Sequence, residues 1–111
     1  MEKAKENIKK INDFLLNSNC SDFRAAKYDK CKLHLTGSFD LCYYHEIEII
    51  FHEVFRLSLE TDIYLDLVQT PFHFCPADDD MIEVSIVDNS NMKHIIVCES
   101  IDVIIGLVKY A

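Results

Sequence analysis

Five histidines and five cysteines give this chain enough ligand atoms for a metal site. The densest group is the run HEIEIIFHE, in which His45 and His52 lie seven residues apart. On a β-strand an odd separation sends the two imidazole rings to opposite faces, whereas a tetrahedral zinc ion needs converging ligands. Other histidine–cysteine pairs share a strand face but lack two further close ligands: His73 with Cys75, and His94 with Cys98. The sequence therefore predicts no metal site and no cofactor.

Carboxylates offer a second chemistry. Glu46 and Glu48 lie two residues apart, so on a strand they share one face, and two carboxylates in a pocket can divide into acid and base. No Gly-rich turn, arginine clamp or tryptophan platform accompanies them. The three acids of the PADDD segment, Asp78 to Asp80, are consecutive and fan outward, unlike the spaced oxygens and glycine of a calcium loop. We expect an exposed loop there.

Nucleophilic catalysis by cysteine is not indicated either. The cysteines are mostly flanked by apolar residues, and no helix N-terminus is evident that would lower a thiol pKa. We expect most of them to be buried and inert. Gly37 and Gly106 are the two glycines of the chain and cannot build a phosphate-binding loop. The residues thus favour a protein that is not an enzyme.

The element that must position these side chains is Leu41 to Leu59, which has no Gly or Pro and is rich in β-branched and aromatic residues. Read as a strand, one face carries His45, Ile47, Ile49 and Phe51. The other face carries Tyr44, Glu46, Glu48, Ile50 and His52. We expect a reversal at Glu53 and two neighbouring antiparallel strands, Cys42–His52 and Val54–Leu59. The alternative is one long helix, which would bring the two histidines together.

The remaining chain is typical of an α+β domain with an N-terminal helix packed on a mostly antiparallel, meander-like sheet. Apolar residues at helical spacing predict a helix from Glu2 to Asn17. The turn at Gly37 to Asp40 should use a positive φ at the glycine. Further strands are expected at Cys31–Thr36, Asp62–Val68, Phe72–Cys75 and Ser100–Tyr110, and Met81–Val87 with Lys93–Cys98 should form a hairpin. Asp22–Tyr28 is a weak extended segment or loop.

Two of these predictions carry conditions. Pro71 would break a ladder, so the strand at Phe72 lies at a sheet edge or begins there. For Ser100–Tyr110 a short helix capped by Ser100 is the competing interpretation.

Composition bounds the protein class. The 111 residues, half of them hydrophobic, are one domain with a single core. A net charge of −8 argues against nucleic acid and against anionic membrane surfaces. No apolar run reaches membrane-spanning length and the charged start has no signal-peptide core. Unpaired thiols without C-x-x-C spacing favour a reducing cytoplasm.

With no catalytic or metal site indicated, the remaining candidate is a surface that binds another protein. Aromatic residues are enriched at protein interfaces, and acids attract basic partners. We therefore predict a partner-binding face for a basic protein, formed by Tyr43, Tyr44, Glu46, Glu48, His52, Asp62 and Asp66. The alternative is that the acids are spread evenly over the surface and steer no partner.

The segment GSFDLCYYHEIEIIFHEV and the closing CESIDV resemble small uncharacterised bacterial proteins, some of them grouped with immunity proteins of polymorphic-toxin systems. The resemblance covers Gly37–Val54 and Cys98–Val103. It implies a small, acidic, cytoplasmic α+β domain that binds and blocks a cognate toxin, and it implies no catalytic residue.

Three functional readings follow. The first is a non-catalytic protein-binding module, of the immunity type. The second is a small-ligand or enzymatic domain with a pocket lined by Tyr44, Glu46, Glu48 and His52. The third is an obligate homodimer that buries the same face.

Overall fold

The computed structural model describes residues 2–39, 44–66 and 70–110 and folds them into one helix, nine strands and a short 3₁₀ turn. The helix is α1 (Glu2–Leu16). The strands are β1 (Asp22–Asp29), β2 (Lys32–Ser38), β3 (Tyr44–His52), β4 (Arg56–Ser58), β5 (Asp62–Tyr64), β6 (Phe72–Pro76), β7 (Ile82–Val87), β8 (Lys93–Cys98) and β9 (Ser100–Lys109). The 3₁₀ turn η1 (Asp78–Asp80) is exposed, as expected for the PADDD loop. The predicted α+β class is confirmed.

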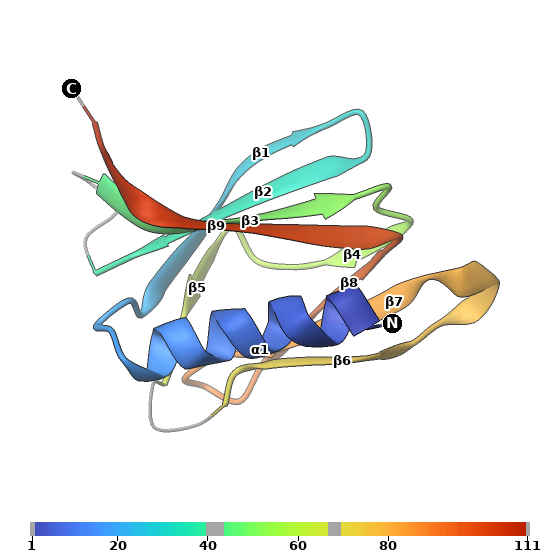
Figure 1. The fold of residues 1–111 in the computed structure, drawn as a ribbon, viewed down its shortest axis with the longest axis horizontal. Coiled ribbons are helices and arrows are strands. Elements are labelled where there is room, and N and C mark those ends of the chain that lie inside the picture. Colours follow the sequence, from blue (N-terminus) through green and yellow to red (C-terminus); the bar gives the residue numbers. More distant parts are fainter. Residues whose placement is uncertain (1, 40–43, 67–69, 111) are drawn as a thin grey trace.

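The strands divide between two antiparallel sheets. Sheet A has the order β5-β1-β2-β3-β9, and sheet B has the order β4-β8-β7-β6. Within them, β1-β2-β3 and β6-β7-β8 follow the expected meander order. Apolar side chains from both sheets and from α1 form one buried cluster, and Figure 1 shows α1 and sheet B on the same side of sheet A.

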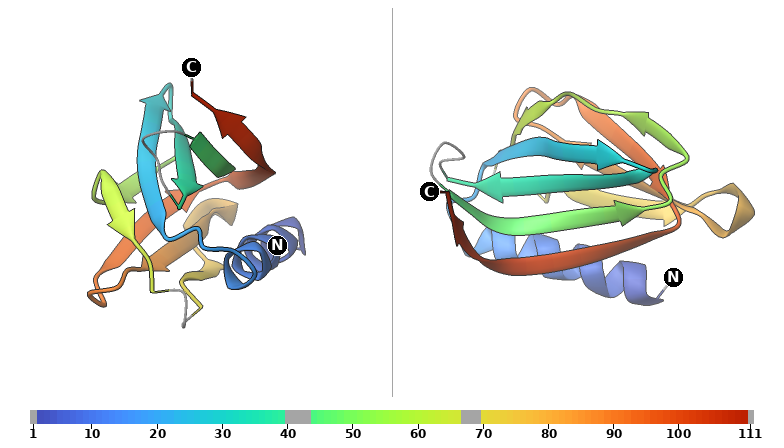
Figure 2. Two further views of the ribbon diagram at one scale, coloured as in Figure 1. Left: turned by 90° about the vertical axis from the view of Figure 1, so that its left-hand side faces the viewer. Right: turned by 90° about the horizontal axis from the view of Figure 1, so that it is seen from above.

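Helix α1 matches its prediction to within one residue, since it ends at Leu16 and Asn17 follows it. Ile8, Ile11 and Leu15 are its buried residues. The helix packs against β6 and β9, one edge strand of each sheet (Figures 1 and 2).

Two asparagines fix this position of the helix. The Asn12 side chain donates to the Phe72 carbonyl (2.9 Å) and accepts from the Phe72 N–H (3.2 Å). Asn7 Nδ2 donates to the Ile101 carbonyl on β9 (2.8 Å). The helix therefore satisfies backbone groups that an edge strand would otherwise leave unpaired.

The organising segment is extended, as predicted, over the residues that the structure describes. β3 lies between β2 and β9, and Ile47, Ile49 and Phe51 on its inner face are 0% exposed. The predicted reversal at Glu53 is only half right: Glu53 has a positive φ of 52° and ends the strand. The pairing with residues 54–59 was wrong, because β4 lies in sheet B and pairs with β8.

The prediction for Gly37 was also wrong. No glycine has a positive φ, and Gly37 lies buried inside β2 rather than in a turn. A Cβ there would meet the Phe23 ring at 2.5 Å, so the glycine leaves the space that this ring occupies. Asp40, the last residue of the predicted turn, lies outside the described residues. A left-handed turn is found at Lys30 and Cys31, which join β1 to β2.

Several other elements agree with the sequence. β7 and β8 pair as the predicted hairpin, β6 is an edge strand beyond Pro71, and residues 100–109 form a strand rather than a helix. Asp22–Asp29, expected only as a weak extended segment, is the full strand β1. The strand expected over Asp62–Val68 is β5, which ends at Tyr64. Ile63 and Leu65 are buried as the alternation predicts, and residues 67 and 68 lie outside the described residues. Among the described residues, no helix is long and apolar enough to cross a lipid bilayer.

Candidate functional site

The candidate site is the outer face of sheet A, which is the face turned away from α1 and sheet B. β3 contributes Tyr44, Glu46, Glu48, Ile50 and His52, all half-buried and alternating with the core residues of the same strand. The other four strands contribute the residues paired with them. The sequence predicted this division of the β3 side chains correctly.

Strand register arranges these side chains in rows, because directly paired residues of antiparallel strands point to the same face. One row crosses all five strands: Asp62, Arg24, Thr36, Glu48 and Ile104. A second row runs across four strands: Lys27, His34, Ile50 and Asp102. The outer face therefore mixes carboxylates with cations, hydroxyls and isoleucine side chains.

Two histidine–carboxylate pairs lie on this face. His52 Nε2 is 2.7 Å from Asp102 Oδ2, and Lys3 Nζ is 3.7 Å from the other carboxylate oxygen. His34 Nδ1 is 3.8 Å from Glu48 Oε2, a distance at which a protonated imidazole forms an ion pair. The hydrogen bond from His52, helped by the positive charges nearby, lowers the pKa of Asp102 from its ordinary value.

Of the other predicted partner-binding residues, Asp62 joins the same face. It lies on β5, where Arg24 Nε donates to Asp62 Oδ1 at 3.0 Å. Asp66 is half-buried beyond the end of β5, and Tyr43 lies outside the described residues. Glu46 accepts a hydrogen bond from the Phe39 N–H at 3.3 Å.

The four described cysteines do not join a site on this face, and Cys42 lies outside the described residues. Cys20 and Cys98 are buried, and burial raises the pKa of each thiol to about 12, with Glu46 adding to the effect at Cys20. Cys31 and Cys75 are exposed, so the prediction that most cysteines are buried was wrong for them.

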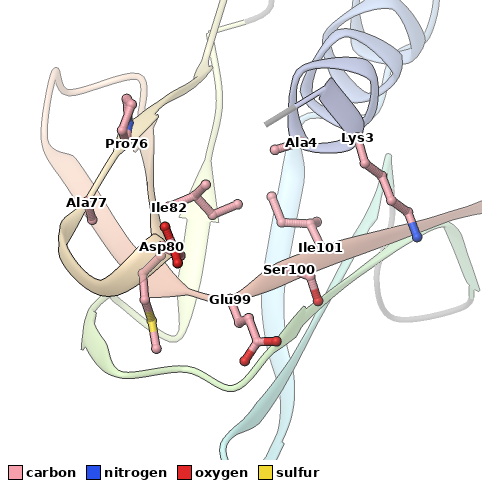
Figure 3. Close-up of a pocket in the computed structure, with 10 residues that line it drawn as sticks. Lys3, Ala4, Pro76, Ala77, Asp80, Ile82, Glu99, Ser100 and Ile101 are labelled. Atoms are coloured by element: carbon pink, nitrogen blue, oxygen red, sulfur yellow. The ribbon is translucent and has the colours of Figure 1, made fainter.

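Three pockets lie away from the outer face. The first, of about 370 Å³, opens between the start of α1, the β6–β7 connection and the β8–β9 connection, with Lys3, Ile82 and Glu99 among its walls (Figure 3). A groove of about 540 Å³ runs between α1 and Ile105, and a pocket of about 270 Å³ is lined by Phe55 and the PADDD loop. None of these three is lined by the residues that the enzymatic alternative required.

The two histidines of the HEIEIIFHE run are separated, as the strand interpretation requires. His45 Nδ1 lies 2.9 Å from the Tyr110 hydroxyl, while His52 contacts Asp102 on the outer face. Across residues 2–39, 44–66 and 70–110, no three His, Cys, Asp or Glu side chains gather closely enough to hold a metal ion.

Comparison of the chain with protein-family models, with curated proteins and with solved structures found no match. The functional argument therefore depends on the geometry of the outer face.

Among the residues of this face that the sequence analysis did not single out are His34 and Asp102. Only the register shows that the strands carrying them flank β3. Asp102 follows His52 by fifty residues along the chain, and no local pattern reports a pairing over that distance.

Proposed function

We propose that this chain is a non-catalytic protein-binding module whose outer face of sheet A docks a basic protein. The observation that carries the proposal is the uncovered face itself: five adjacent strands present continuous rows of polar and apolar side chains, while the helix and sheet B pack on the opposite side. Such a broad surface suits a protein better than a small molecule.

The size of the face supports this assignment. Five strands about 4.8 Å apart, with a nine-residue central strand rising about 3.3 Å per residue, cover roughly 20 by 30 Å. A standard protein interface buries about 800 Å² on each partner, which is of the same order.

The charge distribution favours a basic partner. Glu46, Glu48 and Asp102 gather on β3 and β9, and the whole chain carries a net charge of −8. Arg24 and Lys27 on β1 give the face a pattern of both signs, and such a pattern confers specificity as well as attraction.

The partner class that we propose is a toxin, which the chain would neutralise as an immunity-type inhibitor. The resemblance of Gly37–Val54 to such proteins supports this, and the cytoplasm is the proposed location. The free thiols of Cys20, Cys31, Cys75 and Cys98 suit a reducing compartment.

The test is a pull-down from the source cell with the wild-type chain and two charge-reversed variants. Glu46→Lys with Glu48→Lys alters the outer face. Asp78→Lys with Glu99→Lys changes the net charge equally at exposed positions, which line the third and the first pocket respectively. We expect a basic protein to be retained by the wild type and by the control, and its retention to fall at least 10-fold with the outer-face variant.

Equal retention by all three proteins would overturn the proposed face. A retained partner that is acidic or is a nucleic acid would overturn the proposed partner class.

A further inference from the structure

Two histidines on the outer face of sheet A each lie beside a carboxylate. His52 Nε2 on β3 is 2.7 Å from Asp102 Oδ2 on β9, and His34 Nδ1 on β2 is 3.8 Å from Glu48 Oε2 on β3. The two imidazole side chains are 22 and 28% exposed, so protons from solvent reach both rings. Imidazole is the side chain that ordinarily changes charge between pH 5 and 8. Mild acidification therefore adds positive charge to this face.

The register of sheet A brings the two pairs together around Ile50. This residue pairs with His34 on one side and with Asp102 on the other, while Glu48 and His52 lie two residues away from it on β3. Diagonal neighbours on adjacent strands are about 7–8 Å apart, which long side chains can span. His34, Glu48, Ile50, His52 and Asp102 thus form one group on three adjacent strands, which we call the histidine patch.

Other charged groups face the histidine patch from the neighbouring strands and from α1. Lys27 on β1 pairs directly with His34, and Lys3 Nζ of α1 lies 3.7 Å from Asp102 Oδ1. Further charged residues occupy the adjacent rows of these strands: Arg24 and Asp29 on β1, Lys32 on β2 and Glu46 on β3. Asp, Glu, Lys and Arg side chains ordinarily titrate outside pH 5 to 8. Within that range, the charge of this region therefore changes at the histidines.

Protonation of the two rings changes the sign balance of the histidine patch. When both imidazoles are neutral, the patch carries the two negative charges of Glu48 and Asp102. When both are protonated, each forms an ion pair with its carboxylate and the patch is neutral. The hydrogen bond from His52 lowers the pKa of Asp102 from its ordinary value, so this carboxylate keeps its charge throughout the range in which imidazole titrates.

We propose that the histidine patch makes docking at the outer face pH-sensitive: neutral imidazoles leave the charges of Glu48 and Asp102 to attract a basic partner, and protonation of His34 and His52 neutralises both carboxylates and releases it. The inference rests on the proposed function, since it specifies how docking at that same face is regulated. A basic partner and protons compete for the two carboxylates, so binding weakens as the pH falls from 7.5 to 5.5.

The first test uses a short oligolysine peptide as the basic probe and follows the backbone amide signals of the wild-type chain by NMR at pH 7.5 and pH 5.5. We expect the dissociation constant reported by the signals of Glu48 and Ile50 to rise about 10-fold or more at the lower pH. The exposed acids of the η1 turn are the internal control, and the affinity reported there should change less than about 3-fold.

The second test removes the titrating rings. His34→Gln with His52→Gln should abolish the pH dependence at the outer face, whereas His73→Gln, which removes an exposed histidine of sheet B, should behave as the wild type. Circular dichroism verifies that each variant is folded at both pH values. The imidazole signals of the wild type, followed over the same pH range, show the protonation of His34 and His52 without any substitution.

Imidazole signals of His34 and His52 that do not titrate between pH 5 and 8 would overturn the inference. So would an oligolysine affinity at the outer face that is absent at pH 7.5 or falls no more than the affinity at η1. The pull-down judges the proposed function separately. A chain that retains no basic protein, while its outer face binds oligolysine in a histidine-dependent way, would contradict the function and support the pH-sensitive charge of the face.

Discussion

His94 is the most buried histidine of the described chain, and its two ring nitrogens have different roles. Nδ1 accepts a hydrogen bond from the Glu60 N–H (3.2 Å), so Nε2 carries the proton and donates to Asp88 Oδ2 (2.9 Å). The other Asp88 oxygen accepts from the backbone of Ser90 and Met92 in the β7–β8 turn. Hydrogen bonds through Asp88 and His94 therefore link this turn to the segment that follows β4.

Replacing Asp88 by Asn should destabilise the fold in a pH-dependent way. The amide loses the charge and cannot accept at every contact, so we expect a loss of about 1–3 kcal/mol at neutral pH. The hydrogen bond from His94 lowers the pKa of Asp88 from 3.8, so its stabilising contribution is present above that pH and is lost as the pH falls through the folded-state pKa.

Urea denaturation between pH 7 and pH 2.5 checks this prediction. The difference between wild type and Asp88→Asn should be constant at the upper end of the range and should shrink below pH 3.8. Asp78→Asn, in the exposed η1 turn, is the control and should differ little from wild type throughout. A difference that grows on acidification would contradict the role assigned to Asp88.

At the residue scale, the sequence predicted which β3 side chains point outward, because a period of two needs only a local pattern. It could not show that His52 meets Asp102 or that Glu48 meets His34, since those contacts depend on which strands are neighbours. It also could not place Asp62 beside Arg24, which lies 38 residues earlier.

At the scale of elements, the two glycines provide a matched pair. A Cβ at Gly37 would lie 2.5 Å from the Phe23 ring and 2.9 Å from Ile47 Cγ2, and Phe23 itself packs edge-on against Phe72. The ring therefore has little freedom to move. We expect Gly37→Ala to destabilise the fold by about 1–3 kcal/mol.

Gly106→Ala should be neutral or stabilise by up to about 1 kcal/mol, because Cβ meets open space and the strand conformation suits alanine. Both substitutions are measured by urea denaturation. Equal effects of the two substitutions would mean that the packing at Gly37 is not the constraint that the distances indicate.

Most individual elements were predicted from local patterns, including α1, β2, β3, β7, β8 and β9. The division into two sheets was not, because the described strands cross between the sheets four times, and the first of these crossings begins at a single left-handed residue, Glu53. Local sequence shows where one strand ends and the next begins, but it looks the same for a hairpin and for a crossing between sheets. Only the strand that pairs with β4 distinguishes the two cases, and that strand is β8, some forty residues later.

At the scale of the whole molecule, α1 packs against one edge strand of each sheet. The helix and sheet B lie on the same side of sheet A, so the opposite face of sheet A stays available (Figure 1). This outer face is the one that we propose for a basic protein.

The most direct measurement of the central claim is site-specific photocrosslinking in the source cell. A photoreactive residue replaces Ile50 or Ile104, which lie in adjacent rows of the outer face and are not buried, or Asp78 as the control. The account predicts that both outer-face positions crosslink to the same basic protein and that Asp78 does not. Adducts that form at Asp78 but not at Ile50 or Ile104 would contradict the account.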